Sequence, residues 1–289
     1  MSTFNTKVMS LDGYPLDTTI VEPDESAKGV FLLLHGCPSY KEEWGFYGNE
    51  ANSGKLGMAE FLARNGYASI RFNFRGQGKD LKPEEMGELT LSGMINDVEA
   101  VYQFAVSHFK GCAVHVVGTS FAGGVSLLWS QSYEHKIENL FLMCPLLDMR
   151  DTLVSRGVIG ERSDFVLEGA VAELDCKGYV LSEDRLMNRS FINEILASNV
   201  LSAMKHYDGP LHLFLATHDN TINLGKTYTL LDKVGKRSSS NIIEIPNAVH
   251  GFGPRKDLGY SLEERSKRKY DNWQQIYAKM LSVVEAQGD

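Results

Sequence analysis

Three polar residues of this 289-residue chain could together perform nucleophilic catalysis: Ser120, Asp219 and His250. Each follows an apolar run of the length of a β-strand. A serine hydroxyl becomes a good nucleophile only when a base takes its proton, and the base works best when a third group orients it. Along the chain the three residues supply a nucleophile, an acid and a base, and the carboxyl ends of parallel strands would bring them together.

Ser120 lies where an apolar run gives way to small residues. The sequence VHVVGTSFAGG over residues 114–124 is typical of a strand that turns sharply into a helix, with the serine at the apex. Bulk at Gly118 or Gly123 would collide with the neighbouring strand or with the first helical turn. Glycine also accepts the positive φ that tight turns require. The spacing therefore predicts an accessible serine between a strand and a helix.

Three other residues compete with this set or resemble it. Asp148 also follows an apolar run, so the choice between Asp219 and Asp148 as the acid stays open. We interpret His218 as a loop neighbour of Asp219, and His115, which lies inside a strand, as a hydrogen-bonded core histidine.

Apolar runs and helical periodicity alternate along most of the chain. Residues 4–22 predict a hairpin that turns at Asp12–Gly13. The remaining strands are expected at 29–34, 67–74, 114–117, 136–144, 210–216 and 241–246, and the helices at 55–64, 90–109, 121–132, 224–234 and 262–284. This alternation predicts an α/β fold with a doubly wound, mainly parallel sheet.

The alternation breaks over residues 146–208, where charged and apolar residues mix without a strand rhythm. Residues 164–174 and 191–204 have helical spacing. We interpret 146–208 as an inserted, mostly helical cap over the carboxyl edge of the sheet. The core would then consist of residues 1–145 and 209–289.

With these residues in place, the chain resembles the α/β-hydrolase superfamily over nearly its whole length. The resemblance rests on His35–Gly36, Arg75–Gly78, Gly118–Ala122, Asp219 and His250–Gly251. It implies an α/β-hydrolase fold in which Ser120, Asp219 and His250 form the catalytic triad. The serine motif of this family normally ends in glycine, and here that position is Ala122, the smallest replacement, with two glycines directly after it.

The resemblance also implies an oxyanion hole made of the backbone N–H groups of Cys37 and Phe121. Each such donor is typically worth about 3–4 kcal/mol of transition-state stabilisation. His35 is expected to shape the loop that carries Cys37 and not to act as the base. The Cys37 thiol is not expected to be a nucleophile, because no strand-to-helix turn surrounds it.

The substrate is less well defined by the sequence. Residues 147–153 and 174–179 resemble the lid of the bacterial luminescence acyl-transferases, thioesterases that release fatty acyl groups from acyl carrier protein. The overall layout is also similar to feruloyl and cinnamoyl esterases with a small inserted lid. Apolar residues of the cap are expected to line an acyl tunnel, to pack the cap onto the core, or both: Phe165, Val166, Leu167, Phe191, Ile192, Ile195 and Leu196.

Composition narrows the function further. The net charge of −8 argues against a nucleic-acid surface, and the basic cluster 265–269 is interleaved with acidic residues, as on a solvated helix face. The four cysteines form no CxxC pair, and no HxxxH, HxH, Walker or GxGxxG pattern occurs, so neither a metal nor a nucleotide cofactor is expected. No signal peptide and no apolar run of about 18 residues is present, which favours a cytoplasmic setting without a membrane span. The sequence leaves a homodimer open.

The sequence therefore predicts a serine hydrolase that acts on a small acyl ester or thioester, including one carried on acyl carrier protein or CoA. An acyltransferase, a cyclase or a C–C bond hydrolase would use the same triad. A non-hydrolytic binding protein of this fold would be expected to lack a triad member, and none is missing here.

Overall fold

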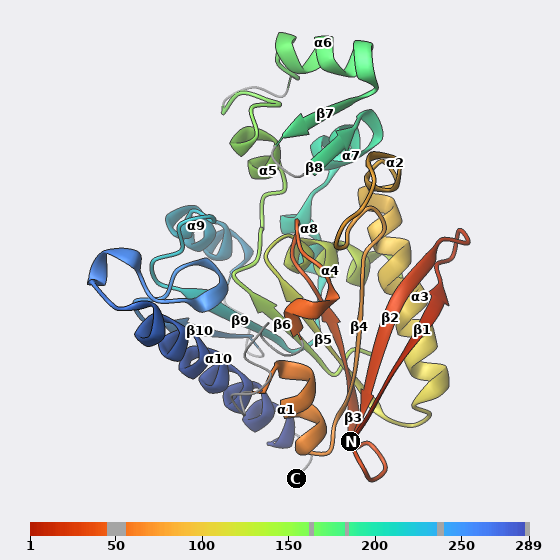
Figure 1. The fold of residues 1–289 in the computed structure, drawn as a ribbon, viewed down its shortest axis with the longest axis vertical. Coiled ribbons are helices and arrows are strands. Elements are labelled where there is room, and N and C mark those ends of the chain that lie inside the picture. Colours follow the sequence, from red (N-terminus) through yellow and green to blue (C-terminus); the bar gives the residue numbers. More distant parts are fainter. Residues whose placement is uncertain (45–55, 162–164, 183–184, 236–239, 287–289) are drawn as a thin grey trace.

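The computed structural model describes residues 1–44, 56–161, 165–182, 185–235 and 240–286 (Figure 1). Its centre is an eight-stranded sheet with the spatial order β1-β2-β4-β3-β5-β6-β9-β10. The strands are β1 (Ser2–Met9), β2 (Pro15–Glu22), β3 (Gly29–Leu34), β4 (Ala68–Phe72), β5 (Ala113–Thr119), β6 (Asn139–Met143), β9 (Leu211–Ala216) and β10 (Ser240–Ile245). The pairs β1–β2 and β2–β4 are antiparallel, and all other neighbours in this sheet are parallel. The predicted hairpin and the mainly parallel sheet are confirmed.

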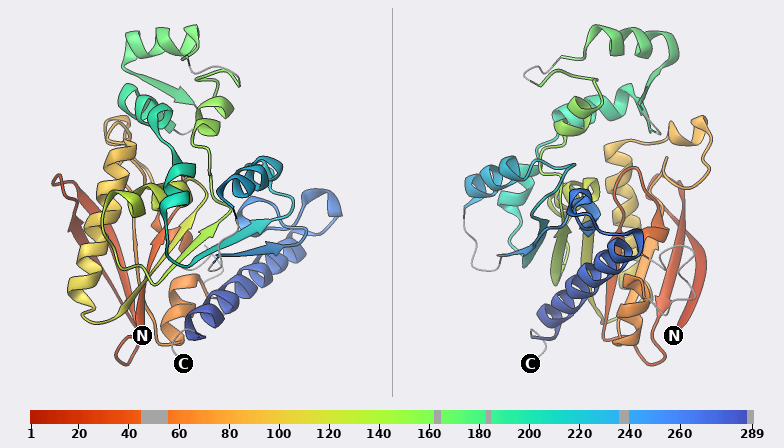
Figure 2. Two further views of the ribbon diagram at one scale, coloured as in Figure 1. Left: turned by 180° about the vertical axis from the view of Figure 1, so that it is seen from behind. Right: turned by 60° about the vertical axis from the view of Figure 1, so that its left-hand side comes forward.

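Helices cover both faces of the sheet, as Figures 1 and 2 show. One face packs against α3 (Leu91–His108), α4 (Phe121–Ser132), α8 (Val200–His206) and α9 (Leu224–Val234), and the other against α1 (Met58–Arg64) and α10 (Leu262–Glu285). Strand β3 shows why both layers are needed, because all six of its residues are buried. Val30 and Leu32 enter one apolar cluster, and Phe31 and Leu33 enter the other. A continuous apolar run of this kind requires cover on both sides.

The helix ends follow local capping signals. The Thr90 side chain accepts a hydrogen bond from the Gly93 N–H (3.0 Å) and begins α3 one residue after the predicted start. The capping box of Ser261 and Glu264 begins α10. Helices α4 and α9 have the predicted bounds. Helix α1 begins at Met58, and the predicted start near Lys55 lies outside the described residues.

Residues 146–208, which we call the insert, join β6 to β9. They contain α5 (Arg150–Ser155), α6 (Glu168–Lys177), β7 (Tyr179–Ser182), β8 (Arg185–Asn188), α7 (Arg189–Ala197) and α8. In Figure 1 the elements α5, α6, β7, β8 and α7 lie beyond the end of the sheet, whereas α8 packs against α4. Within the insert, β8 and α7 also contact the core, against α2 (Pro83–Met86) and α3 respectively.

Two expectations for the insert were wrong in detail. The single helix predicted over 191–204 is two helices, because Asn199 interrupts it and caps α8 by accepting a hydrogen bond from Ser202 N–H (2.9 Å). The β7–β8 hairpin was not predicted, since strands of four residues are too short to show an alternating pattern. The helix expected at 164–174 starts at Glu168, and Asp164 lies outside the described residues.

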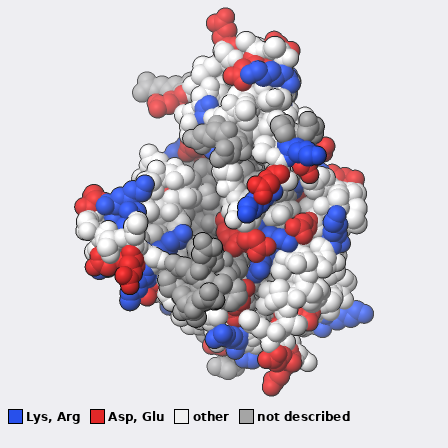
Figure 3. All heavy atoms as spheres, in the orientation of Figure 1, with Lys and Arg blue, Asp and Glu red and all other residues white. Residues whose placement is uncertain are grey.

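Basic and acidic side chains are mixed over the face of the molecule in Figure 3. Among the described residues, no helix combines the length and the hydropathy needed to cross a lipid bilayer.

Candidate active site

The carboxyl edge of the sheet brings Ser120, His250 and Asp219 together. Ser120 follows β5, Asp219 follows β9 and His250 follows β10, and these strands lie on one side of the sheet with only β6 between them. Ser120 Oγ is 3.0 Å from His250 Nε2. His250 Nδ1 is 2.8 Å from Asp219 Oδ2. A continuous hydrogen-bond chain therefore links the carboxylate, the imidazole and the hydroxyl.

The backbone holds Ser120 in a conformation that non-glycine residues rarely adopt, with φ 51° and ψ −118°. Its N–H donates to the Met143 carbonyl (2.8 Å), and its own carbonyl accepts from the N–H groups of Leu146 (2.9 Å) and Gly123 (3.0 Å). Two of these three bonds come from the chain that leaves β6. The neighbouring strand therefore fixes the turn that presents the hydroxyl.

Small residues around Ser120 are required by close backbone contacts. A Cβ at Gly118 would lie 2.4 Å from Ser126 Oγ, and one at Gly123 would lie 2.7 Å from Pro145 Cβ. Ala122, which departs from the family motif, is fully buried, and its methyl group belongs to the apolar cluster on that face. The severe crowding thus falls on Gly118 and Gly123, so the alanine is accommodated.

Asp219 is held as a carboxylate. Its Oδ1 accepts hydrogen bonds from the N–H groups of Thr221 and Ile222, both at 2.8 Å, while Oδ2 faces His250. Burial raises the pKa of Asp219, but the hydrogen bonds and charge of His250 and the two backbone N–H groups outweigh it, so that the pKa lies below its ordinary value. The group facing His250 Nδ1 is therefore a charged acceptor at neutral pH.

The thiol of Cys144 adjoins this carboxylate, which the sequence did not reveal. Cys144 Sγ, an Asp219 oxygen and a His250 nitrogen all lie within 4.8 Å of one another, the one such group of potential metal ligands in the described part of the chain. Burial and the Asp219 charge raise the pKa of the Cys144 thiol well above its usual value. The thiol therefore stays protonated at neutral pH, and the other two groups are already hydrogen-bonded to each other.

The loop after β3 is braced by a neutral histidine. His35 is fully buried, with Nδ1 2.7 Å from the Gly36 carbonyl and Nε2 3.2 Å from the Phe74 N–H. Burial lowers the pKa of His35 to about 4, so the ring donates through Nδ1 and accepts through Nε2. Both ring nitrogens are thus bonded to backbone groups, and the ring positions the chain that leads to Cys37, next to a cis Cys37–Pro38 peptide bond.

Glu43 is the second brace of this loop, and sequence reasoning missed it. Its Oε1 accepts from the Gly36 N–H (3.1 Å), and its Oε2 accepts from the Ser39 hydroxyl. Burial raises the pKa of Glu43 to about 7. No motif marks this residue, because its role depends on a short 3₁₀ turn (Lys41–Trp44) that folds back on the loop.

The two backbone groups expected to form the oxyanion hole flank Ser120. Phe121 is the first residue of α4 and directly follows the serine. The loop that carries Cys37 approaches from the other side, since a Cβ at Gly36 would lie only 3.4 Å from Ser120 Cβ. Both N–H groups therefore belong to segments that adjoin the nucleophile.

The motif Arg75–Gly78 has a structural role at this edge. The Arg75 guanidinium bonds Asp97 (2.6 Å) and Asp12 (2.5 Å), joining α3 to the first hairpin. A Cβ at Gly76 would lie 2.8 Å from the Leu89 backbone N. Gln77 follows, and its Oε1 accepts from the Ser39 N–H at 3.4 Å. The motif therefore supports the loop of Cys37 through this hydrogen bond of Gln77 to Ser39.

The competing residues lie elsewhere. Asp148 forms an ion pair with Lys226 (2.8 Å), and Asp219 is the carboxylate that bonds His250. His218 is exposed, and its Nδ1 lies 3.0 Å from the Thr217 hydroxyl. His115, the histidine inside β5, is buried with its Nδ1 3.2 Å from the side chain of Asn139, as expected of a core histidine.

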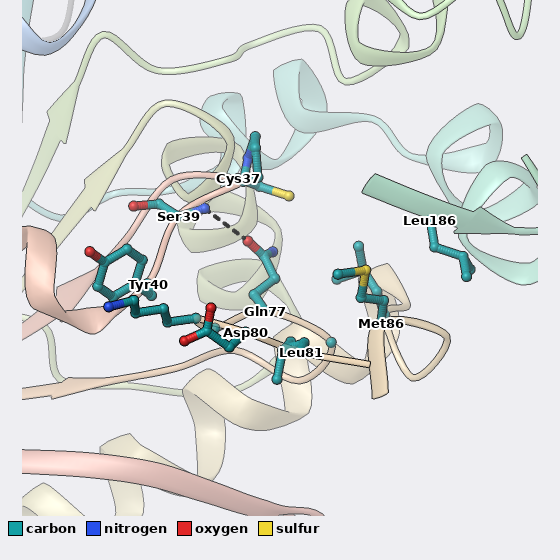
Figure 4. Close-up of a pocket in the computed structure, with 13 residues that line it drawn as sticks. Cys37, Ser39, Tyr40, Gln77, Asp80, Leu81, Met86 and Leu186 are labelled. Atoms are coloured by element: carbon teal, nitrogen blue, oxygen red, sulfur yellow. Dashed lines mark hydrogen bonds between the residues drawn. The ribbon is translucent and has the colours of Figure 1, made fainter. Parts of the chain in front are cut away.

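Two pockets meet at Cys37, Pro38 and Ser39. The first, the His250 pocket, has a volume of about 350 Å³ and contains Ser120. It is lined by Gly36, Cys37, Pro38, Ser39, Glu43, Thr119, Ser120, Arg156, Thr221, His250, Gly251, Lys269 and Trp273. The second, the Leu186 pocket, has a volume of about 530 Å³ and is drawn in Figure 4. It is lined by Cys37, Pro38, Ser39, Tyr40, Gly76, Gln77, Gly78, Lys79, Asp80, Leu81, Met86, Leu89 and Leu186.

This fold and this edge of the sheet are those of a known family. The chain matches the family described as alpha/beta hydrolase fold over residues 29–194, which is more than half of its length. The protein therefore belongs to the α/β-hydrolase fold family, as the sequence resemblance implied.

Solved structures agree with the fold. Est1E from Butyrivibrio proteoclasticus, solved with bound ferulic acid, has 15% identity and a TM-score of 0.67 over 93% of this chain and 98% of that one. A soluble variant of monoglyceride lipase from Saccharomyces cerevisiae, in complex with a substrate analogue, has 16% identity and a TM-score of 0.67 over 99% and 96%. Alpha/beta hydrolase domain-containing protein 10 from mouse has 14% identity and a TM-score of 0.66 over 98% and 99%. No curated protein sequence matches the chain, and identities this low support the fold alone.

Proposed function

We propose that this protein is a serine hydrolase that cleaves a carboxylic ester or thioester through an acyl-Ser120 intermediate. The observation that carries the proposal is the hydrogen-bond chain from Asp219 through His250 to Ser120. Its last two residues, His250 and Ser120, line the His250 pocket. Ser120 is the nucleophile, His250 the base and Asp219 the group that orients and stabilises the imidazolium. The backbone N–H groups of Cys37 and Phe121 are the oxyanion donors.

The reaction follows from these positions. Ser120 Oγ attacks the substrate carbonyl carbon while its proton passes to His250 Nε2. The oxyanion that forms accepts hydrogen bonds from Cys37 and Phe121 N–H, each worth about 3–4 kcal/mol in such sites. The intermediate collapses to the acyl-serine, and the leaving alcohol or thiol takes the proton from Nε2. Water then repeats the sequence and releases the acid.

The substrate class is supported from two sides. Two similar structures are Est1E with bound ferulic acid, a carboxylic acid, and a monoglyceride lipase with a substrate analogue, and a monoglyceride is a carboxylic ester. The insert, residues 146–208, contributes Arg156 to the His250 pocket and Leu186 to the Leu186 pocket, as expected of a cap that selects substrates. A thioester on acyl carrier protein or CoA would react by the same steps, as would transfer of the acyl group to an acceptor other than water.

A fluorophosphonate probe tests the nucleophile directly. We expect the wild-type protein and the exposed-serine control Ser132→Ala to be labelled, and Ser120→Ala to remain unlabelled. Turnover of p-nitrophenyl acetate should follow the same pattern, and parallel assays with an acyl thioester and with an added acceptor alcohol distinguish hydrolysis of either bond from transfer. Absence of wild-type labelling, or equal labelling of Ser120→Ala, would refute the proposal and favour a binding protein.

A further inference from the structure

The two pockets differ in which reacting group they adjoin. His250 lines only the smaller one, and the two share the loop of Cys37, Pro38 and Ser39. A general acid must lie within hydrogen-bond reach of the atom it protonates. If Ser120 and His250 act as proposed above, the leaving oxygen or sulfur must therefore occupy the His250 pocket.

The other substituents of the tetrahedral carbon have fixed directions too. One bond goes to Ser120 Oγ, and the oxyanion faces the N–H groups of Cys37 and Phe121. The acyl chain needs a direction away from His250, and the Leu186 pocket opens beside Cys37 on the far side of the loop. We therefore propose that the Leu186 pocket binds the acyl group of the substrate, and that this group is an apolar chain longer than acetyl.

The walls of the pocket specify this chemistry. Its rim carries the exposed side chains of Lys79 and Asp80, whereas Leu89 is 2% and Leu186 4% exposed. Figure 4 shows Met86 and Leu186 on the side of the pocket away from Tyr40. The polar groups thus lie at the mouth and the apolar ones at the inner end, which suits an acyl chain that enters beside the loop and ends against leucine and methionine.

The inner end is built from two elements that are bonded to each other. Met86 ends α2 (Pro83–Met86), and Leu186 lies in β8 of the insert. Two residues after Leu186, at the end of β8, the Asn188 side chain donates to the carbonyls of Gly87 (2.8 Å) and Leu89 (3.1 Å). These bonds hold the two apolar walls together, so the length of the pocket is fixed by the insert and not by the sheet.

A chain-length series of p-nitrophenyl esters tests the assignment. We expect Leu186→Trp to lower kcat/KM for the octanoate by about tenfold or more, since each methylene in an apolar pocket is worth about 10-fold or more. The loss should be smaller for the acetate, so the ratio of the octanoate to the acetate kcat/KM should fall in Leu186→Trp and stay at the wild-type value in the control. Leu181→Trp is the matched control: Leu181 pairs with Leu186 in the β7–β8 hairpin but is 54% exposed and does not line the pocket. Met86→Trp should reproduce the effect if Leu186→Trp does not fold.

The outcomes separate this inference from the proposed function. Suppose that fluorophosphonate labels the wild type, but that the three variants Leu186→Trp, Met86→Trp and Leu181→Trp share one chain-length profile. This result overturns the acyl-pocket assignment and leaves the proposed function standing. A loss that follows the size of the leaving group in a series of aryl acetates, and not the acyl chain, overturns it as well. Absence of labelling in the wild type overturns both proposals.

Discussion

The sheet edge and the insert hold their functional residues by different means. Around Ser120 the bonds are backbone to backbone, to Met143, Leu146 and Gly123, and close contacts leave no room for a Cβ at the nearby glycines. Beyond Leu146, its first residue, the insert is tied to the core by side chains: Asn188 to the α2–α3 connection, Glu194 to Ser92, and Lys226 of α9 to Asp148 and Asp151.

If the proposed function holds, this difference separates chemistry from substrate selection. A single substitution removes a backbone donor only where proline replaces the residue, so the turn of Ser120 is expected to keep its geometry while surface residues change. Side-chain ties can be lost one at a time, so the insert can change its contacts, and the pocket wall it provides, without disturbing the sheet. The position of Leu186 in the insert and of His250 in the core is consistent with specificity residing in one region and turnover in the other.

The largest expected effect separates two carboxylates that the sequence left as alternatives. Asp219→Asn should lower kcat by about 10⁴. The neutral amide lacks the negative charge that stabilises the imidazolium of His250, and it no longer fixes the tautomer and orientation of the ring. Asp148→Asn should leave kcat for p-nitrophenyl acetate within about threefold, since Asp148 pairs with Lys226 at the root of the insert. Steady-state kinetics at pH 8 measure both.

The opposite ranking of these variants would contradict the acid assignment. Both should keep the wild-type circular dichroism spectrum and fluorophosphonate labelling site, which shows that the difference lies in catalysis and not in folding.

The same contrast explains what the sequence could and could not predict. Parallel strands put their carboxyl ends at one edge, so the order of Ser120, Asp219 and His250 after three apolar runs was enough to bring them together. The bounds of α4 and α9 were also predicted, because the apolar spacing of both helices and the Asn223 cap of α9 are local. Local signals of this kind survive in any tertiary context.

The contacts that were missed depend on chain segments meeting in space. Glu43 reaches the loop after β3 through a 3₁₀ turn, and Cys144 meets Asp219 because β6 lies between β5 and β9. The choice between Asp219 and Asp148 needed the same three-dimensional information. In the insert, the break at Asn199 and the β7–β8 hairpin depend on a few residues each, too few to produce a period.

Glycine substitutions should show the same contrast in stability. Gly123→Ala places a methyl group 2.7 Å from Pro145 Cβ, and such overpacking typically costs about 1–3 kcal/mol. Gly169→Ala in α6 of the insert meets nothing within 4 Å and replaces glycine inside a helix, which should stabilise by about 0.5–1 kcal/mol. Urea denaturation with both variants measures the difference. Equal changes would mean that the crowding at Gly123 relaxes without cost.

Loss of the Asn188 side chain should loosen the insert and leave the sheet edge intact. Asn188→Ala removes the bonds to Gly87 and Leu89 and the cap of α7, whose Phe191 N–H it accepts at 2.7 Å. Asn199→Ala is the matched control, because it removes only a cap, that of α8. Each lost cap costs about 1 kcal/mol.

Asn188→Ala should therefore be less stable than Asn199→Ala, because it loses the bonds to Gly87 and Leu89 besides a cap, and the two variants should also differ in kinetics. Only Asn188→Ala should raise KM for p-nitrophenyl octanoate, by about three- to tenfold, with kcat for the acetate unchanged, because about 1 kcal/mol of pocket order corresponds to that factor. If Asn199→Ala raised KM as much, the bonds to Gly87 and Leu89 would not be what holds the pocket wall.

The smallest expected effect is a pH dependence that belongs to the sheet edge. Burial raises the pKa of Glu43 from 4.5 to about 7, so the folded state binds a proton more tightly than the unfolded state. The contribution of Glu43 to stability is therefore fully present below about pH 4.5 and is lost as the pH rises to about 7.

His35 acts in the opposite sense, because its pKa of about 4 lies below the ordinary 6.5, and it adds stability as the pH rises between these values. Comparing the wild type with Glu43→Gln at each pH removes the share of His35. On changing from pH 5 to pH 8, Tm should fall further in the wild type than in Glu43→Gln, by on the order of 2 °C, since about 1 kcal/mol moves Tm by a few degrees in a domain of this size. Differential scanning calorimetry at the two pH values measures this. Parallel pH curves for the two proteins would show that Glu43 does not titrate between these pH values in the folded state.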